Sequence, residues 1–267
     1  MKVKAFLILA LCAVFHSCDM VDAQIVWLSN KNMDFSDCEM EDRNVRDFEA
    51  ITCSCPFDVI YEQSRSCYVT VEGDEAYLRR VYTRVNRGVL DISLEPMRYR
   101  NVRLRVRVGS PDISELVMTG SGSIICSGDI ETDNDLTLRV TGSGDITARN
   151  IECADLTSSV AGSGDIKLGS IAANQVKVSL AGSGDWTARR IVAENLEVSV
   201  AGSGDVSISD VDIENELSVS VAGSGDVRIS GSTRNAVARV IGSGDITGNL
   251  SFRHISKSKT GSGSIRW

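Results

Sequence analysis

Residues 196–208 decide the fold, and they read Leu196-Glu197-Val198-Ser199-Val200-Ala201-Gly202-Ser203-Gly204-Asp205-Val206-Ser207-Ile208. Apolar and polar side chains alternate on both sides of the glycines, which is the periodicity of a β-strand with one buried face. Glycine has no Cβ, so it suits a sharp turn in which another backbone approaches closely. The stretch therefore predicts two short strands that meet at a glycine corner.

The same Gly-Ser-Gly motif occurs eight times in the second half of the chain. The motifs begin at Gly120, Gly142, Gly162, Gly182, Gly202, Gly223, Gly242 and Gly261, so that the spacings are 22, 20, 20, 20, 21, 19 and 19 residues. A period this regular indicates stacked structural repeats rather than a globular domain. We therefore expect an all-β fold, a parallel β-helix or β-solenoid with about 20 residues per coil.

Alignment of the repeats produces columns of apolar residues that would stack about 4.8 Å apart and form a continuous core. The column after the aspartate contains Ile146, Ile166, Trp186, Val206, Val227 and Ile246. The column two residues before the first glycine contains Val140, Val160, Leu180, Val200, Val221 and Val240. Cys126 and Cys153 occupy positions that are apolar in other repeats, so they are interpreted as core residues.

Six of the repeats carry an aspartate directly after the glycine corner, namely Asp145, Asp165, Asp185, Asp205, Asp226 and Asp245. Carboxylates about 4.8 Å apart repel one another, so each must be compensated. One interpretation is that each carboxylate accepts hydrogen bonds from N–H groups of the corners. The alternative is a bound cation, as in calcium-binding solenoids with Gly-rich repeats. One aspartate per coil favours the structural role, and no metal site or cofactor is predicted.

The last repeat departs from the pattern. Lys257 and Lys259 occupy core positions that are Val178 and Leu180 in an earlier repeat. Trp267 falls in the column of Ala188 and Ile208. Because a solenoid needs a polar or bulky cap, these residues are predicted to close the end of the stack.

The first 23 residues have the order of a secretory signal peptide: a start that contains Lys2 and Lys4, the apolar run Ala5–Phe15, and polar and small residues up to Ala23. The apolar run is too short for a transmembrane helix, which needs about 20 residues. Cleavage after Ala23 is one alternative, and lipidation of Cys18 is the other. Either one predicts an exported protein of the periplasm, the outer membrane or the cell surface, with a lipid anchor in the second case.

Residues 24–110 are predicted to form a β-rich segment before the solenoid of residues 111–267, with one helical turn within residues 74–81. Cys38, Cys53, Cys55 and Cys67 lie in this segment, and an exported chain can oxidise them. They are candidates for a disulfide cluster with three alternative pairings. Reduced, buried thiols are the other interpretation.

Arginines alternate with apolar residues near the end of this segment. Residues 77–110 contain 9 basic and 2 acidic side chains, and Arg103, Arg105 and Arg107 would share one face of a strand. Such an arginine row can bind an anionic ligand such as a polysaccharide. More often a row like this is a solvated face that pairs with nearby acids.

Several segments, taken in order, resemble one known family. They are Asp47-Phe48-Glu49-Ala50-Ile51, Pro56-Phe57-Asp58-Val59, Val71-Glu72-Gly73-Asp74, Leu90-Asp91-Ile92 and Leu116 to Ser123. Over residues 45–267 the chain resembles the putative auto-transporter adhesins with a head GIN domain. The resemblance implies a β-helix-like fold, export to the envelope of Gram-negative bacteria and an adhesive role, and it brings no catalytic residues.

The composition disfavours several functions. His254 is the single histidine after residue 23, which argues against a zinc site with several histidines and against a Ser-His-Asp triad. Net acidity and the predicted export disfavour nucleic-acid binding. We expect a non-catalytic envelope or surface protein that binds an anionic glycan or another envelope component. A solenoid polysaccharide lyase or hydrolase and a purely structural envelope component are the alternatives.

Overall fold

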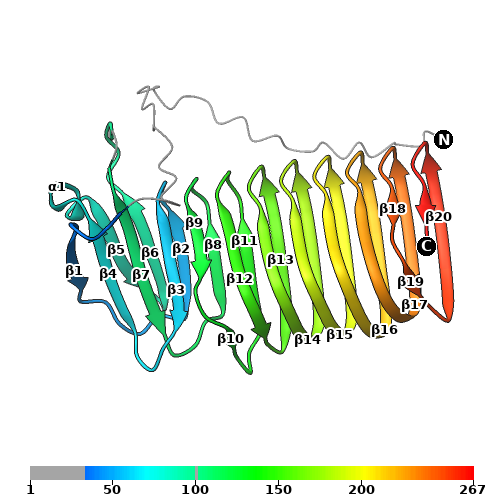
Figure 1. The fold of residues 1–267 in the computed structure, drawn as a ribbon, viewed down its shortest axis with the longest axis horizontal. Coiled ribbons are helices and arrows are strands. Elements are labelled where there is room, and N and C mark those ends of the chain that lie inside the picture. The colour runs from blue at the N-terminus through cyan, green and yellow to red at the C-terminus, as the bar shows by residue number, and fades with distance from the viewer. Residues whose placement is uncertain (1–33, 100–101) are drawn as a thin grey trace, which may run out of the picture.

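The computed structural model describes residues 34–99 and 102–267 as an elongated stack of β-coils (Figure 1). The predicted signal peptide, including Cys18, lies outside the described residues. Within these ranges, no helix has the length and apolarity needed to cross a membrane. The predicted helical turn is α1 (Glu75–Leu78), and everything else that is regular is strand. The predicted all-β solenoid is therefore confirmed.

Two groups of strands build the molecule. The N-terminal group comprises β1 (Glu39–Arg43), β2 (Ala50–Ser54), β3 (Asp58–Gln63), β4 (Tyr68–Gly73), β5 (Val81–Asn86), β6 (Val89–Leu94) and β7 (Leu104–Ser110). The repeats form β8 (Glu115–Met118), β9 (Ser123–Cys126), β10 (Ile130–Glu131), β11 (Leu136–Val140), β12 (Asp145–Glu152), β13 (Asp155–Gly162), β14 (Ile166–Gly182), β15 (Trp186–Gly202), β16 (Val206–Gly223), β17 (Val227–Gly242), β18 (Ile246–Thr247), β19 (Leu250–Ser251), β20 (His254–Gly261) and β21 (Ile265–Arg266).

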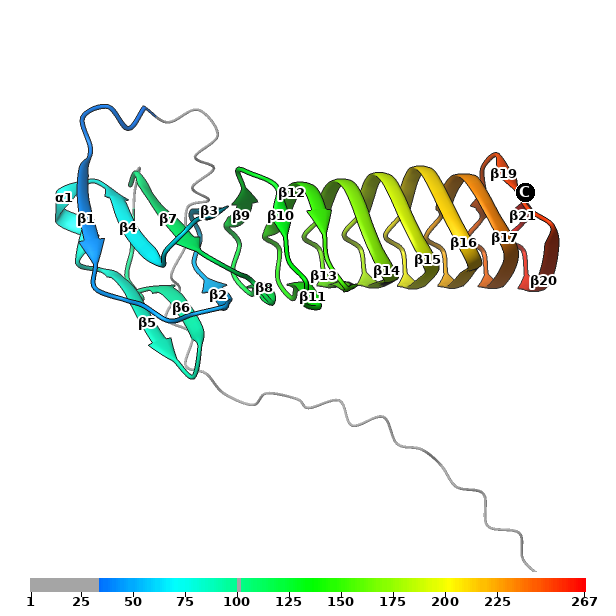
Figure 2. The same ribbon diagram turned by 90° about the horizontal axis from the view of Figure 1, so that it is seen from below.

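Each coil has three sides, and the burial pattern of β16 defines them. Its buried residues alternate with exposed ones as Val206 and Ile208, then Val211 and Ile213, then Leu217, Val219 and Val221. The alternation breaks between these sets, and each break is a corner. We call the side before the Gly-Ser-Gly corner the first side, the side after it the second, and the side that contains residues 211–213 the third. Neighbouring coils pair in parallel along the stack (Figure 2). Strands β14 and β15 keep one register over all three sides, whereas the register of β15 and β16 shifts by one residue between Ala193 and Asn195.

The predicted glycine corners are confirmed by their packing. The N–H groups of Ser203 and Gly204 both donate to the carbonyl oxygen of Gly182 in the preceding coil, at 2.9 and 3.1 Å. A Cβ added at Gly204 would overlap the carbonyl oxygen of Gly184. Gly242 has a φ of +129°, which side chains other than glycine rarely adopt. The corner therefore requires glycine for both close approach and backbone conformation.

The core columns are buried as predicted, and they contain one polar pair. Trp186 is fully buried in the column after the aspartates, and its indole N–H donates to the hydroxyl oxygen of Ser158 at 2.7 Å. Ser158 is also fully buried, at a position that is Val178 in the next coil. A buried hydroxyl without a partner would be costly, so the indole explains why the core tolerates this serine.

The solenoid also extends to the N-terminal side of the coil that contains the first Gly-Ser-Gly motif. Strands β2 and β3 pair in parallel with β8 and β9, so they form a coil of the same solenoid although they precede residue 111. Strands β6 and β7 in turn pair with β2 and β3 on the opposite side. The coil made from β2 and β3 therefore lies between two coils that follow it in sequence. Strands β5, β4 and β1 add antiparallel pairings that cover this end.

The last coil has the polar character that the sequence predicts. Lys257 and Lys259 pair with Ala238 and Val240 of the buried columns, yet both lysines are exposed. Trp267 is partly buried against the core, and Lys257 Nζ donates to its carbonyl oxygen at 3.1 Å. Charged residues thus replace apolar ones where the described stack stops.

The corner geometry predicts a position-specific cost for adding one methyl group. We expect Gly204→Ala to lower the free energy of unfolding by about 3 kcal/mol, because the stacked backbones cannot separate without loss of hydrogen bonds. Gly128→Ala is the control, since nothing lies within 4 Å of a Cβ at that position. Urea denaturation of both variants checks the prediction. Equal losses would contradict the stacking argument.

Candidate functional site

The arginine row lies at the end of the solenoid where β7 pairs with β4. Register places Arg105 opposite Glu72 and Arg107 opposite Thr70. Arg105 Nε and Nη2 donate to the two carboxylate oxygens of Glu72, each at 2.6 Å, and Arg107 Nε donates to the same carboxylate at 3.2 Å. Glu72 is only 2% exposed. The sequence left open whether the arginine row forms ion pairs with acidic residues. In the structure, Arg105 and Arg107 pair with the buried carboxylate of Glu72.

Arg103, the third arginine of the row, binds the residues that precede β1. Arg103 donates from Nε and Nη2 to Asp74 at 3.1 and 2.9 Å, and from Nη1 to the carbonyl oxygen of Asp34 at 2.9 Å. The guanidinium group of Arg105 lies 4.1 Å from the centre of the Phe35 ring, which is a cation–π contact. These contacts hold residues 34 and 35 against β7.

Electrostatics agree with a structural role for this cluster. Burial raises the pKa of Glu72, but hydrogen bonds and charge from Arg105 and Arg107 outweigh burial and hold the pKa below its ordinary value. Arg107 is the most exposed member of the row, with 43% of its side chain accessible. Ligand binding by Arg103, Arg105 and Arg107 remains a prediction, and Arg107 is the member best placed for it.

The predicted disulfide cluster is not present in the structure. Cys38, Cys53, Cys55 and Cys67 are all free thiols. Cys53 and Cys55 are buried, and burial together with a hydrogen bond involving Cys55 raises the pKa of Cys53 well above its ordinary value. Cys67 Sγ contacts the carbonyl oxygen of Phe48 at 3.7 Å. Cys126 and Cys153 lie in the hydrophobic core, as predicted.

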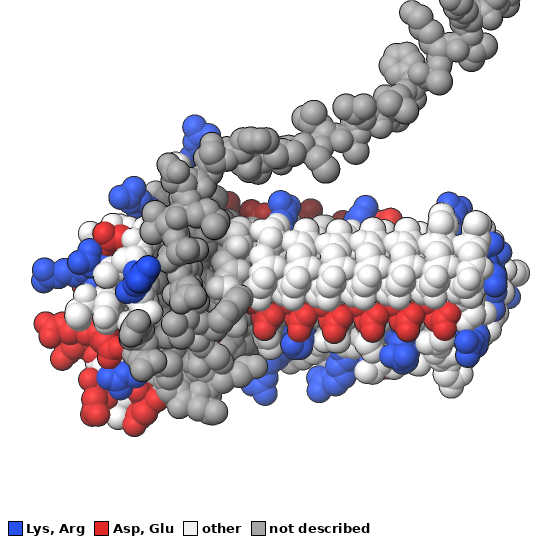
Figure 3. Space-filling model, turned by 90° about the horizontal axis from the view of Figure 1, so that it is seen from above, with Lys and Arg blue, Asp and Glu red and all other residues white. Residues whose placement is uncertain are grey.

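The aspartates form a straight row beside a smooth, uncharged ridge of corner residues (Figure 3). One oxygen of each carboxylate accepts the backbone N–H of the equivalent residue in the next coil, from Asp165 N–H on Asp145 through Ser264 N–H on Asp245, at 2.7–3.0 Å. Hydrogen bonds from Ser264 hold the pKa of Asp245 below its ordinary value. The aspartates are therefore part of the ladder that joins coils. Among the described residues, no three His, Cys, Asp or Glu side chains form a set that could hold a metal ion.

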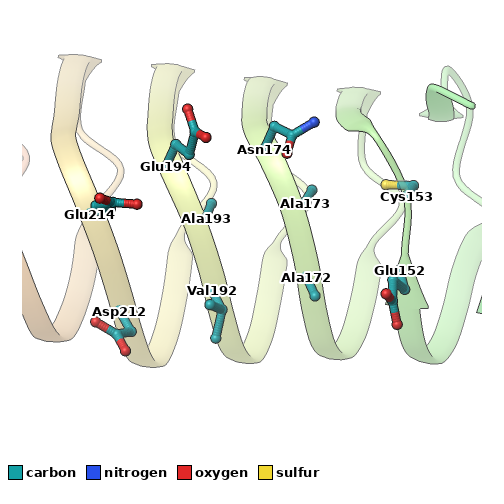
Figure 4. A pocket seen from close by; sticks show the side chains of 10 residues that line it. All are labelled: Glu152, Cys153, Ala172, Ala173, Asn174, Val192, Ala193, Glu194, Asp212 and Glu214. Atoms are coloured by element: carbon teal, nitrogen blue, oxygen red, sulfur yellow. The ribbon is translucent and has the colours of Figure 1, made fainter. Parts of the chain in front are cut away.

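A groove on the third side is a feature that sequence reasoning missed. It encloses about 560 Å³ and runs across coils of β12, β14, β15 and β16. Register aligns Glu152, Ala172, Val192 and Asp212 in one outward-facing column along it. Glu194 and Glu214 lie beside this column (Figure 4). The groove therefore has an apolar centre with carboxylates at both ends and along one edge.

Comparison with known proteins fits this architecture. A family model described as putative auto-transporter adhesin, head GIN domain, matches residues 47–232. The chain belongs to this family. No curated protein shows significant similarity to it.

Solved structures share the head GIN fold. A protein from Parabacteroides distasonis ATCC 8503, described as a putative lipid binding protein, is 27% identical with a TM-score of 0.73, and the match covers 86% of this chain and 96% of that one. A putative adhesin from the same strain is 20% identical with a TM-score of 0.78 and the same coverage. One from Parabacteroides merdae ATCC 43184 is 20% identical with a TM-score of 0.74, over 86% and 95% of the two chains. Neither the family nor these proteins are described as enzymes.

The ion-pair cluster predicts unequal roles for two neighbouring arginines. Arg105→Gln should lower the free energy of unfolding by about 3 kcal/mol, because it leaves a buried carboxylate with a single weaker partner. Arg107→Gln should cost less than about 1 kcal/mol, because its side chain is exposed. Chemical denaturation at neutral pH measures both. A larger loss for Arg107→Gln would show that the cluster is described wrongly.

We expect hydrogen bonds from the aspartate row, and not bound calcium, to stabilise the folded chain. Asp205→Ala removes the acceptor for the Asp226 N–H and should cost about 1 kcal/mol. Asp205→Asn keeps an acceptor oxygen and should cost less. Thermal melting with and without EDTA is the second measurement, and we expect the same melting temperature. A drop of many degrees that calcium reverses would establish a cation in the row.

Proposed function

We propose that the chain is a non-catalytic protein of the cell envelope or cell surface that binds a partner through the side of its solenoid. Membership of the head GIN family supports an adhesin-like surface role. Export is proposed from the signal-like residues 1–23, with either cleavage after Ala23 or lipidation of Cys18.

The observation that carries the proposal is the third-side groove. The coils of β14, β15, β16 and β17 pair with one another along most of their length, so the side of the stack offers a partner a preformed surface. The groove hollows that surface where Val192 is 41% exposed. Exposed apolar groups inside a rimmed depression are typical of interaction sites.

The repeated carboxylates favour binding over polysaccharide cleavage. A catalytic acid needs an environment that differs from that of its neighbours, so that its pKa is matched to its task. The aspartates of the row instead share one backbone contact, since each accepts the equivalent N–H from the next coil. Arg107 remains the candidate contact for an anionic glycan, at the end of the molecule where β7 pairs with β4.

A binding and turnover assay on the same surfaces tests the proposal. We expect the purified chain to be retained on intact bacterial or host cells, or on a glycan array, without releasing soluble sugar products. Arg107→Gln and a groove variant, Glu152→Gln with Asp212→Asn, then show which surface is used. Release of reducing sugar at a steady rate would replace the binding proposal with an enzymatic one. Absence of retention on every surface would leave a structural role.

A further inference from the structure

We propose that the third-side groove binds an extended basic peptide segment of a partner protein, with cationic side chains four residues apart and a small apolar side chain between them. This inference rests on the proposed binding function, and it specifies the chemical class of partner for the third-side groove. It is carried by the shape of the groove, its apolar centre and its unpaired carboxylates.

The coils change in length at one end of the groove. The coils that begin at Gly142, Gly162 and Gly182 each contain 20 residues, whereas the coil before them contains 22 and the coil after them contains 21. The additional residue of the 21-residue coil produces a register shift between β15 and β16 at Ala193 to Asn195. The three 20-residue coils carry Glu152, Ala172 and Val192, and the 21-residue coil carries Asp212 at one end of the groove.

The centre of the groove is small and apolar. Ala172 and Val192 are exposed on its floor, and Ala173 and Ala193 line it at the corner, where the next coil has Ile213. Small side chains on the floor leave the backbone of β14 and β15 close to the surface. A partner can therefore approach closely, and an apolar side chain placed on Val192 would bury exposed hydrocarbon.

The acidic groups around this centre lack counter-ions in the described part of the chain. Glu152, Glu194 and Glu214 form no ion pair there, and the nearby Arg190 is paired with Asp210. Asp212 accepts one hydrogen bond, from the hydroxyl of Ser232 at 3.3 Å. The groove is therefore a site of uncompensated negative charge, which attracts cations and repels anionic glycans.

Spacing selects an extended peptide over a single cation. Glu152 and Asp212 are three coil steps apart in one column, or about 14 Å at about 4.8 Å per step. In an extended strand, residues four apart have side chains on the same face about 13.6 Å from each other. Two lysines at that separation can reach both carboxylates, while the residue midway between them lies over Ala172 and Val192. One metal ion cannot bridge such a distance.

A pair of synthetic peptides of identical composition tests the proposal. The first, Gly-Lys-Ser-Val-Ser-Lys-Gly, has lysines four residues apart with valine between them, and the second, Gly-Lys-Lys-Ser-Val-Ser-Gly, has adjacent lysines. Fluorescence anisotropy of the labelled peptides with the purified chain at low salt measures the dissociation constants. We expect at least fivefold tighter binding of the first peptide, and weaker binding of it as salt screens the charges.

Variants locate the site. Glu152→Gln with Asp212→Asn should weaken binding of the first peptide at least tenfold without changing the melting temperature. Glu197→Gln is the matched control, since Glu197 is exposed on the first side and pairs with Lys177. Equal binding of the two peptides, no binding by the unaltered chain, or an equal loss in the Glu197 control would overturn the inference. Displacement of the peptide by millimolar calcium at constant ionic strength would overturn it in favour of a cation site.

The outcome is separable from that of the proposed function. Retention of the chain on cells or glycans together with failure to bind the first peptide refutes the basic-peptide inference alone. Loss of cell retention in the groove variant, together with loss of peptide binding, supports both.

Discussion

The close stacking of each Gly-Ser-Gly corner on the corner before it is the constraint on which this structure depends. Because a carbonyl oxygen of the preceding coil occupies the space that a Cβ would need, only glycine lets successive coils approach to strand-pairing distance. Once corners stack, side chains at equivalent positions must also stack. Valines and isoleucines then form continuous core columns, and aspartates form a row in which each carboxylate accepts an N–H from the next coil.

At the N-terminal end, the glycine corner packs against a coil whose corner contains other residues. In the coil of β2 and β3, Cys55 and Phe57 stand where the next coil has Gly120 and Gly122, and the backbone of that coil fits closely against them. Strand β7 pairs in parallel with β3 and antiparallel with β4, and the buried Glu72 of β4 binds Arg105 and Arg107 of β7. The arginine row therefore fastens this end of the molecule, and Arg107 is its most exposed member.

The surface that we propose as a binding site lies where the stack is irregular. Identical coils present identical groups, which gives rigidity but little recognition. The groove of Glu152, Val192 and Asp212 lies where a run of three 20-residue coils meets a 21-residue coil. The register shift between β15 and β16 is confined to this corner, and the residue pairs on either side of it keep the buried columns aligned.

The sequence by itself determined the repeat, the glycine corners, the inward columns and the short helical turn, because these depend on local periodicity and on the steric demands of single residues. Tertiary structure decided what the sequence left open. It paired Arg105 with a glutamate 33 residues away, left the four N-terminal cysteines as free thiols and inserted the β2–β3 coil between later ones. It also formed the groove, whose lining comes from four coils. Each of these features depends on which distant segments become neighbours, and pairing over long separations is selected by packing of the whole stack rather than by any local pattern.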